Sequence, residues 1–190
     1  MSAGIAPSVV PPDQHRELVR HMRNVLAVVR ALVRRAALAE NESDEHRARL
    51  EGRINAFARA QAGLLHDLRR GADLENLVRD QLVLFGVAPD ADVAIGGPPV
   101  RLDAQATGLV ALLLHELALG TIDDSGRPTS ISWHVDDEGT LRLEWIDTAV
   151  GQRNTEWIKG AIRYELGGVL TDEGPRCLLV LPARYVIATA

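Results

Sequence analysis

The chain has 190 residues, of which 46% are hydrophobic and 25% are charged, so its composition is that of one compact domain or two small ones. Its single cysteine, Cys177, excludes an internal disulfide framework and a cysteine-based zinc site. No apolar run approaches 18 residues, and Met1 to Val10 have no basic segment of a secretory signal. We therefore expect a cytoplasmic protein that does not enter a membrane.

The charge is unevenly distributed along the chain. Residues 12–70 carry 12 Arg against 8 Asp and Glu, whereas residues 71–190 carry 9 Arg and Lys against 18 Asp and Glu. Such asymmetry suggests different partners for the two parts. The excess of four positive charges is small for a nucleic-acid binder, so we expect the basic part to meet an acidic protein and no nucleic acid.

The first part is predicted to be a helical hairpin over residues 13–70, after a flexible tail over residues 1–12. Asp13 is the expected N-cap of the first helix, and residues 41–44 form the turn. Apolar positions follow a 4-3-4-3-4 spacing in both helices, with Gln61 as a polar member that can set the register. These positions are Leu18, Met22, Val25, Val29, Leu32 and Ala36, then Leu50, Ile54, Phe57, Gln61, Leu64 and Leu68. Because one hairpin cannot bury both stripes, we expect a homodimer that forms a four-helix bundle.

The second part, residues 71–190, alternates helices with strands and is predicted to be a two-layer α/β sandwich. The fold class is therefore α+β, a helical hairpin followed by this sandwich. Asp103 is the expected cap of a helix that is apolar nearly all round and must be buried. The expected helices span 73–85, 104–119 and 154–166, and the expected strands span 93–95, 100–102, 129–135, 140–145 and 177–181.

The run from Glu17 to Leu26, E-L-V-R-H-M-R-N-V-L, is similar to the phosphoacceptor signature E-L-x-H-R-x-K-N-x-L of the HWE class of bacterial histidine kinases. The His-Arg order is exchanged, so Arg20 stands at the family's phosphoacceptor position and His21 follows it. The resemblance covers residues 14–183 and implies a dimeric hairpin followed by an ATPase-like domain. Further matches lie in the family's order at 57–60 (F-A-R-A), 71–74 (G-A-D-L), 100–102 (V-R-L), 115–118 (H-E-L-A), 143–145 (L-E-W) and 164–168 (Y-E-L-G-G).

The nucleotide site that this resemblance implies is degenerate. In the family the H-E-L-A block leads to an Asn that ligates Mg²⁺, where this chain has Gly120. Asp123-Asp124 replace a Lys-Tyr pair, and Gln152-Arg153-Asn154 replace a glycine-rich turn. Because only four residues separate Asp147 from Gln152, we expect the nucleotide lid to be deleted. We therefore expect no cofactor and no metal at the remnant site. Its residues are His115, Glu116, Gly120 and Asp147, of which His115 and Glu116 are expected to form a hydrogen-bonded pair.

Two features of the first helix are candidates for function. On a helical wheel His21 lies about 60° from the centre of the apolar stripe, which suits either a phosphoacceptor or a packing histidine. A basic stripe lies on the outer face and has almost no acidic partners on the same helix. With Asn24 it is predicted to dock an acidic receiver domain, and the alternative is a solvated charged face. The stripe consists of Arg16, Arg20, Arg23, Arg30 and Arg34.

These observations favour a two-component signalling protein that docks response-regulator receiver domains without using ATP. Phosphoryl groups would pass through His21, as in a histidine phosphotransferase. The alternative is a non-catalytic adaptor or decoy that sequesters a response regulator or a histidine kinase. An active kinase is disfavoured by the lost Asn and glycines, so whether the chain is an enzyme stays open at this point.

Overall fold

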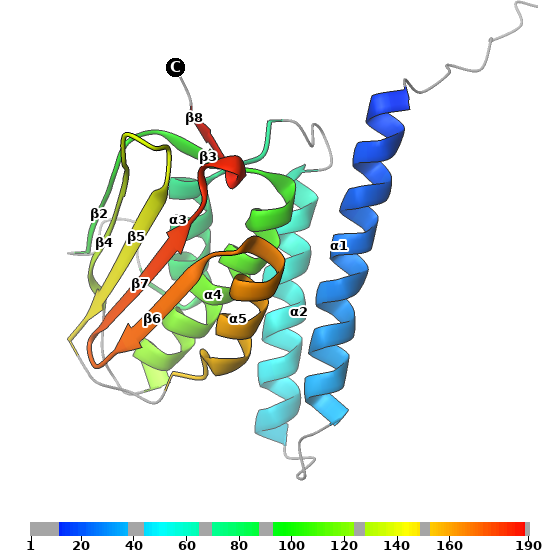
Figure 1. The fold of residues 1–190 in the computed structure, drawn as a ribbon. Coiled ribbons are helices and arrows are strands. Elements are labelled where there is room, and N and C mark those ends of the chain that lie inside the picture. The colour runs from blue at the N-terminus through cyan, green and yellow to red at the C-terminus, as the bar shows by residue number, and fades with distance from the viewer. Residues whose placement is uncertain are drawn as a thin grey trace, which may run out of the picture.

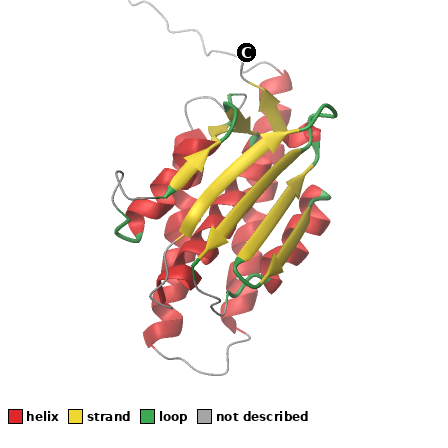
Figure 2. Ribbon diagram, turned by 90° about the vertical axis from the view of Figure 1, so that its left-hand side faces the viewer, coloured by secondary structure: helices red, strands yellow, loops and turns green. Residues whose placement is uncertain are grey.

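The computed structural model describes residues 12–37, 44–64, 70–87, 93–123, 128–148 and 153–188. They form two layers, with a β-sheet on one side and helices on the other (Figures 1 and 2). The helices are α1 (Pro12–Ala37), α2 (Asp44–Leu64), α3 (Leu74–Leu84), α4 (Ala104–Asp123) and α5 (Glu156–Ala161), which continues as the π-helical turn η1 (Ile162–Leu166). The strands are β1 (Ala72–Asp73), β2 (Ala94–Gly96), β3 (Val100–Leu102), β4 (Pro128–Val135), β5 (Leu141–Asp147), β6 (Val169–Glu173), β7 (Arg176–Leu181) and, after the 3₁₀ turn η2 (Ala183–Tyr185), β8 (Val186–Ala188).

The main sheet has the strand order β2-β4-β5-β7-β6. β2 runs parallel to β4, and the other neighbouring strands are antiparallel. Alternate residues of β5 are buried, which places Leu141, Leu143 and Trp145 toward the helical layer. A smaller antiparallel sheet has the order β1-β3-β8. The mixed α+β architecture expected from the sequence is confirmed.

Two aspartates fix the starts of helices, as the sequence predicts for Asp103. The Asp103 carboxylate accepts a hydrogen bond from the Ala106 amide at 2.8 Å, at the start of α4. The Asp73 carboxylate accepts one from the Asn76 amide at 3.0 Å, at the start of α3. Each side chain satisfies a backbone donor that has no partner within its helix.

The central helix of the helical layer is α4, in which every residue from Ala106 to Ala118 is buried. Its stretch Ala104–Thr121 is long and apolar enough to cross a membrane, but 83% of that stretch is buried inside the fold. It is therefore a core helix, as its apolar character on all sides predicts.

Several elements differ from the sequence-based expectation. Residue 12 already belongs to α1, while residues 1–11 and the turn residues 41–43 lie outside the described residues. The helix expected over 154–166 begins at Glu156, becomes π-helical and ends at Gly167, whose φ is 61°. The pattern does not predict β1, β6 or β8, and in β6 only Leu170 is buried, too few apolar positions to stand out.

The hairpin packs against α4 of the same chain. On α2, Phe57, Ala60 and Leu64 are buried. A Cβ added to Gly108 of α4 would lie 2.5 Å from the Phe57 ring and 2.8 Å from Gln61, so both side chains meet α4. Gln61 thus faces α4 and not a seam between two hairpins. Within this stripe Ile54 is exposed, and residue 68 lies beyond the described part of the chain.

The expected stripe of α1 divides between two faces. Leu32 is buried, and Val25 and Val28 pack against the core. The other face is exposed and apolar, and we call it the outer apolar face. It consists of Leu18, Met22, Leu26, Val29 and Val33, which are 41–60% exposed. One side of the hairpin therefore needs no second copy, and the predicted dimer depends on the outer apolar face.

Candidate functional site

His21 lies at the edge of the face of α1 that packs on the core. It is half-buried, and its Nδ1 is buried without a hydrogen-bond partner among the described residues. Burial lowers the pKa of His21, and the Asp103 carboxylate partly offsets this effect. The imidazole is therefore largely neutral near pH 7 and keeps a nucleophilic lone pair.

The basic stripe lies on the solvent side of α1, as predicted. Arg16, Arg20, Arg23, Arg30 and Arg34 are all exposed. Arg20, Arg23 and Arg30 form no ion pair with any side chain in the described part of the chain. These cations are available for an acidic partner.

Asn24 is half-buried beside this stripe and lines a pocket of about 360 Å³ between α1, α4 and α5. Trp157 and the largely exposed Tyr164 line the same pocket. The structure thus brings the predicted docking residue Asn24 next to an aromatic-lined hollow that the sequence does not predict.

Glu116 on α4 forms a buried ion pair with Arg53 on α2. The Arg53 Nε and Nη2 atoms donate to the two carboxylate oxygens at 2.5 and 2.9 Å, and both side chains are at most 4% exposed. The guanidinium also lies over the Trp157 ring, 5.5 Å from its centroid. The pair ties the hairpin to the helix that carries the H-E-L-A block.

No hydrogen bond joins His115 to Glu116, so the expected pair is wrong. Adjacent residues of a helix do not face each other. The His115 ring instead packs against Phe85, with centroids 5.2 Å apart, and a Cβ added to Gly52 would lie 2.9 Å from its Nε2. Burial lowers the pKa of His115, which Glu116 opposes and Arg53 reinforces.

His21 and His115 both have lowered pKa values, so we expect the protein to lose stability in mild acid. Because their pKa values are lowered in the folded state, the unfolded chain binds more protons near pH 6.5 and below, and the free energy of unfolding must fall as the pH falls from 7.5 to 5.5. Each histidine contributes at most about 1.4 kcal/mol per pH unit. Urea unfolding of His115→Gln should show a shallower dependence than that of the parent.

The matched control is His134→Gln, since His134 is exposed on β4. This variant should keep the parent's dependence on pH. Equal slopes for the two variants would contradict the assignment of a neutral, buried His115.

Asp147 is buried at the end of β5 and both of its carboxylate oxygens are occupied. Oδ1 accepts hydrogen bonds from Thr121 Oγ1 at 2.9 Å and from Trp145 Nε1 at 2.6 Å. Oδ2 pairs with the Arg153 guanidinium. The sequence analysis names Asp147, Trp145 and Arg153 in separate motifs, but it predicts none of these contacts.

Arg153 links Asp147 to β6 and covers the end of α4. It donates to Asp172 at 2.7 Å, and a Cβ added to Gly120 would lie 3.0 Å from its Cγ. Burial alone would lower the pKa of Arg153, but Asp147 and Asp172 outweigh that effect and raise it. The Arg153 cation is therefore fixed between two carboxylates.

Among the described residues of the predicted remnant site, Gly120 offers no side-chain oxygen for Mg²⁺, which requires oxygen ligands. Glu116 and Gly120 lie four residues apart on one face of α4, and Arg53 and Arg153 cover these two positions. The expected contributions of Asp124 and Gln152 lie outside the described residues.

His21 and the predicted remnant nucleotide site around Glu116 are not brought together within one chain. His21 is close enough to Asp103 for that carboxylate to affect it, and Glu116 lies thirteen residues further along α4. At 1.5 Å per residue, this separation is about 20 Å. Contact between the two sites would require another copy or a rearranged hairpin.

Comparisons with known proteins agree with this architecture. The model of the HWE histidine kinase family matches residues 15–99. Blue-light-activated histidine kinase 1 of Erythrobacter litoralis is 28% identical over 170 residues, 82% of this chain and 46% of that protein. A blue-light-activated histidine kinase of Rhizobium johnstonii is 31% identical over 131 residues, 64% of this chain and 36% of that protein. The chain thus spans less than half the length of either relative.

Solved structures show the same fold at low sequence identity. The Erythrobacter litoralis EL346 blue-light activated histidine kinase superposes with a TM-score of 0.63 at 16% identity, covering 92% of this chain and 65% of that chain. The histidine kinase domain of EL346 gives 0.52 at 14% identity, covering 89% and 92%. The hairpin and the sandwich therefore have the fold of histidine kinase domains. Residues 15–99 match the HWE histidine kinase family, and the chain is similar in sequence to two blue-light-activated histidine kinases.

Proposed function

We propose that the chain is a cytoplasmic phosphorelay protein that docks receiver domains of response regulators without using ATP. One observation carries the proposal. Arg53 and Arg153 cover the face of α4 that would meet a nucleotide. The side of α1 that carries the basic stripe remains exposed. These two features support docking through the helix that carries His21 and argue against the use of a nucleotide.

The basic stripe supports an acidic partner. Arg20, Arg23 and Arg30 present positive charge along the solvent side of α1, with no ion pair to a side chain that the structure describes. Receiver domains carry a cluster of aspartates, and complementary charges accelerate the encounter of two proteins. The hollow lined by Asn24, Trp157 and Tyr164 beside the stripe would accept an apolar side chain of that partner.

His21 supports phosphoryl transfer. A neutral imidazole nitrogen attacks the aspartyl phosphate of the receiver, the P–N bond forms, and the aspartate oxygen leaves as a carboxylate. Because Nδ1 is buried, Nε2 is the nitrogen that would react. The reverse step returns the phosphoryl group to a second receiver.

Charge reversal on the stripe tests the docking step. At low salt, Arg20→Glu with Arg23→Glu should slow association with receiver domains of the source organism by at least about tenfold, because favourable steering becomes repulsion. For the parent, association should slow as salt rises, since exposed charges are screened over about 8–10 Å at physiological ionic strength. Stopped-flow or surface-based kinetics would measure both effects.

The matched control reverses two exposed arginines away from α1, Arg47→Glu with Arg163→Glu. This variant carries the same change in net charge and should associate much faster than the α1 variant. If both double variants bind equally, the stripe is a solvated face and the docking proposal fails.

We also propose a homodimer through the outer apolar face of α1. The exposed fractions of Met22, Leu26 and Val33 are 56, 58 and 60%. A contiguous apolar face of this kind is typical of an interface between helices. A second copy would bring two hairpins together through α1, in place of the predicted bundle in which the stripe of α2 also lies in the seam.

A non-catalytic adaptor is the second candidate, and one observation favours it. Arg20 occupies the phosphoacceptor position of the family signature, and His21 has only part of its ring in solvent. Such a protein would sequester a response regulator or a histidine kinase and would never carry a phosphoryl group. His21→Ala separates the two functions, because it abolishes transfer but leaves binding nearly intact.

A further inference from the structure

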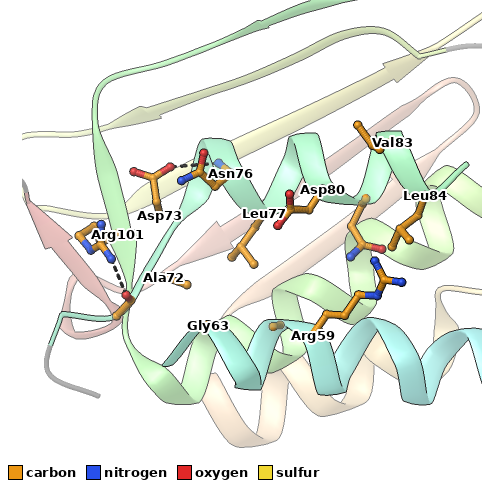
Figure 3. A pocket seen from close by; sticks show the side chains of 13 residues that line it. Arg59, Gly63, Ala72, Asp73, Asn76, Leu77, Asp80, Val83, Leu84 and Arg101 are labelled. Carbon is orange, nitrogen blue, oxygen red and sulfur yellow. Dashed lines mark hydrogen bonds between the residues drawn. The ribbon is translucent and has the colours of Figure 1, made fainter. Parts of the chain in front are cut away.

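A second pocket lies between α2 and α3, away from α1 and from the covered face of α4. Its volume is about 540 Å³, within the range of small-molecule sites. In Figure 3, Arg59 and Gly63 come from α2 on one side, and Leu77, Asp80 and Leu84 come from α3 on the other. None of the predicted functional residues lines it.

Two of the four charged residues that line this pocket, Asp73 and Arg101, already form hydrogen bonds within the fold. Asp73 caps α3 through the amide of Asn76, and Arg101 donates to the carbonyl oxygens of Arg70 and Gly71 at 2.5 and 2.8 Å. Figure 3 draws the contact between Asp73 and Asn76 and the contact between Arg101 and Gly71 as dashed lines.

The other two charged residues, Arg59 and Asp80, are exposed and have no partner among the described residues. They come from opposite walls and do not pair with each other. The pocket therefore presents one free cation and one free anion, and its four charges cancel.

Gln81 also lines this pocket, and its side-chain carbonyl oxygen is a hydrogen-bond acceptor without a donor among the described residues. Its side chain is 3% exposed, and its Oε1 accepts no hydrogen bond from the described residues. A buried carbonyl oxygen without a donor is unfavourable, so a ligand that supplies an N–H group there is favoured.

Small residues keep the pocket open on the α2 side. A Cβ added to Gly63 would meet no atom within 4 Å, so this position borders free space. Ala60 lies on the same wall, and Leu77 and Leu84 give the opposite wall an apolar surface.

We propose that this pocket binds a small zwitterion, a free α-amino acid. Arg59 takes the carboxylate, Asp80 takes the ammonium group, and Gln81 Oε1 accepts an N–H of the ligand. The ligand's side chain packs on Leu77 and Leu84. A polyanion such as a nucleotide is disfavoured because Asp80 and Asp73 repel it.

The test titrates the full chain with each of the twenty α-amino acids up to about 10 mM, followed by thermal unfolding and calorimetry. At least one should raise the unfolding midpoint and bind saturably. Its N-acetyl and its amide derivatives, which each lack one charge, should bind at least about tenfold more weakly. Arg59→Gln and Asp80→Asn should each weaken binding to a similar degree.

Gly63→Leu should abolish binding by filling the pocket, whereas Ala62→Leu, on the exposed side of the same helix, should leave it unchanged. Receiver docking should be unaffected in both variants, which separates this site from the proposed function. The proposal is overturned if no amino acid binds below about 10 mM, if Gly63→Leu binds as the parent does, or if the uncharged derivatives bind equally well.

Discussion

Glu116→Gln is expected to lower the free energy of unfolding by about 3–5 kcal/mol, because it leaves the Arg53 guanidinium buried without its counter-charge. Both side chains of this pair are almost inaccessible to solvent, and the guanidinium donates to both carboxylate oxygens. The loss is a large share of the stability of an ordinary domain, about 5–15 kcal/mol. Since the pair joins α2 to α4, its loss should also loosen the hairpin that carries His21.

Chemical denaturation measures this effect, with Glu75→Gln as the matched control. Glu75 pairs with Arg79 on the surface of α3, so its loss should cost no more than about 1 kcal/mol. Replacing both Arg53 and Glu116 by methionine should restore most of the stability, because no buried charge remains. An equal cost for Glu116→Gln and Glu75→Gln would show that the buried pair does not hold the two helices together.

Met22→Glu with Val29→Glu is expected to convert a dimer into a monomer. Both residues lie on the outer apolar face, where a second copy would bury the introduced carboxylates at a cost of several kcal/mol. In the monomer the same side chains are exposed, so the fold should be retained. Light scattering at tens of micromolar, with circular dichroism as the check on folding, would measure the change.

Ala27→Glu is the matched control because Ala27 is an exposed residue on the opposite side of α1. It should remain dimeric. Leu64→Glu is not informative about association, since Leu64 is fully buried within one chain and its replacement would unfold the monomer. A parent protein that is monomeric at tens of micromolar would show that the outer apolar face does not pair.

Helix-capping residues and the hydrophobic pattern of single segments predict several elements of this fold. Asp73 and Asp103 cap their helices, and the apolar α4 is buried, because each signal depends on near neighbours in the chain. β6 escapes prediction because Thr171, Asp172 and Glu173 are polar and the strand is held by its pairing with β7. An edge strand of this kind depends on its neighbour more than on its own hydrophobic pattern.

The packing of the hairpin shows where periodicity stops being informative. Successive residues of a helix are 100° apart, so Val25 and Val29 differ by only about 40° and can be assigned to one stripe. In the structure Val25 faces the core of its own chain and Val29 faces outward. A 4-3-4 spacing predicts that a helix has an apolar side but does not identify the helix that covers it.

The candidate site depends on contacts between distant segments, which the sequence does not predict. Arg53 and Glu116 are 63 positions apart, and Arg153 reaches both Asp147 and Asp172. The spacing of apolar residues around Arg53 could have predicted that its side chain is buried. It lies three residues after Leu50 and four before Phe57, a spacing that places a charge on the buried side of α2 and implies a buried partner.

The central claim is that phosphoryl groups reach this protein from a receiver domain and not from ATP. The most direct measurement follows radiolabelled phosphate on the full chain, once with a phosphorylated receiver and once with Mg-ATP alone. We expect label from the receiver, loss of that label in His21→Ala with receiver binding retained, and no label from ATP. Label that arrives from Mg-ATP in the absence of a receiver would contradict a receiver-fed phosphorelay and identify an active kinase.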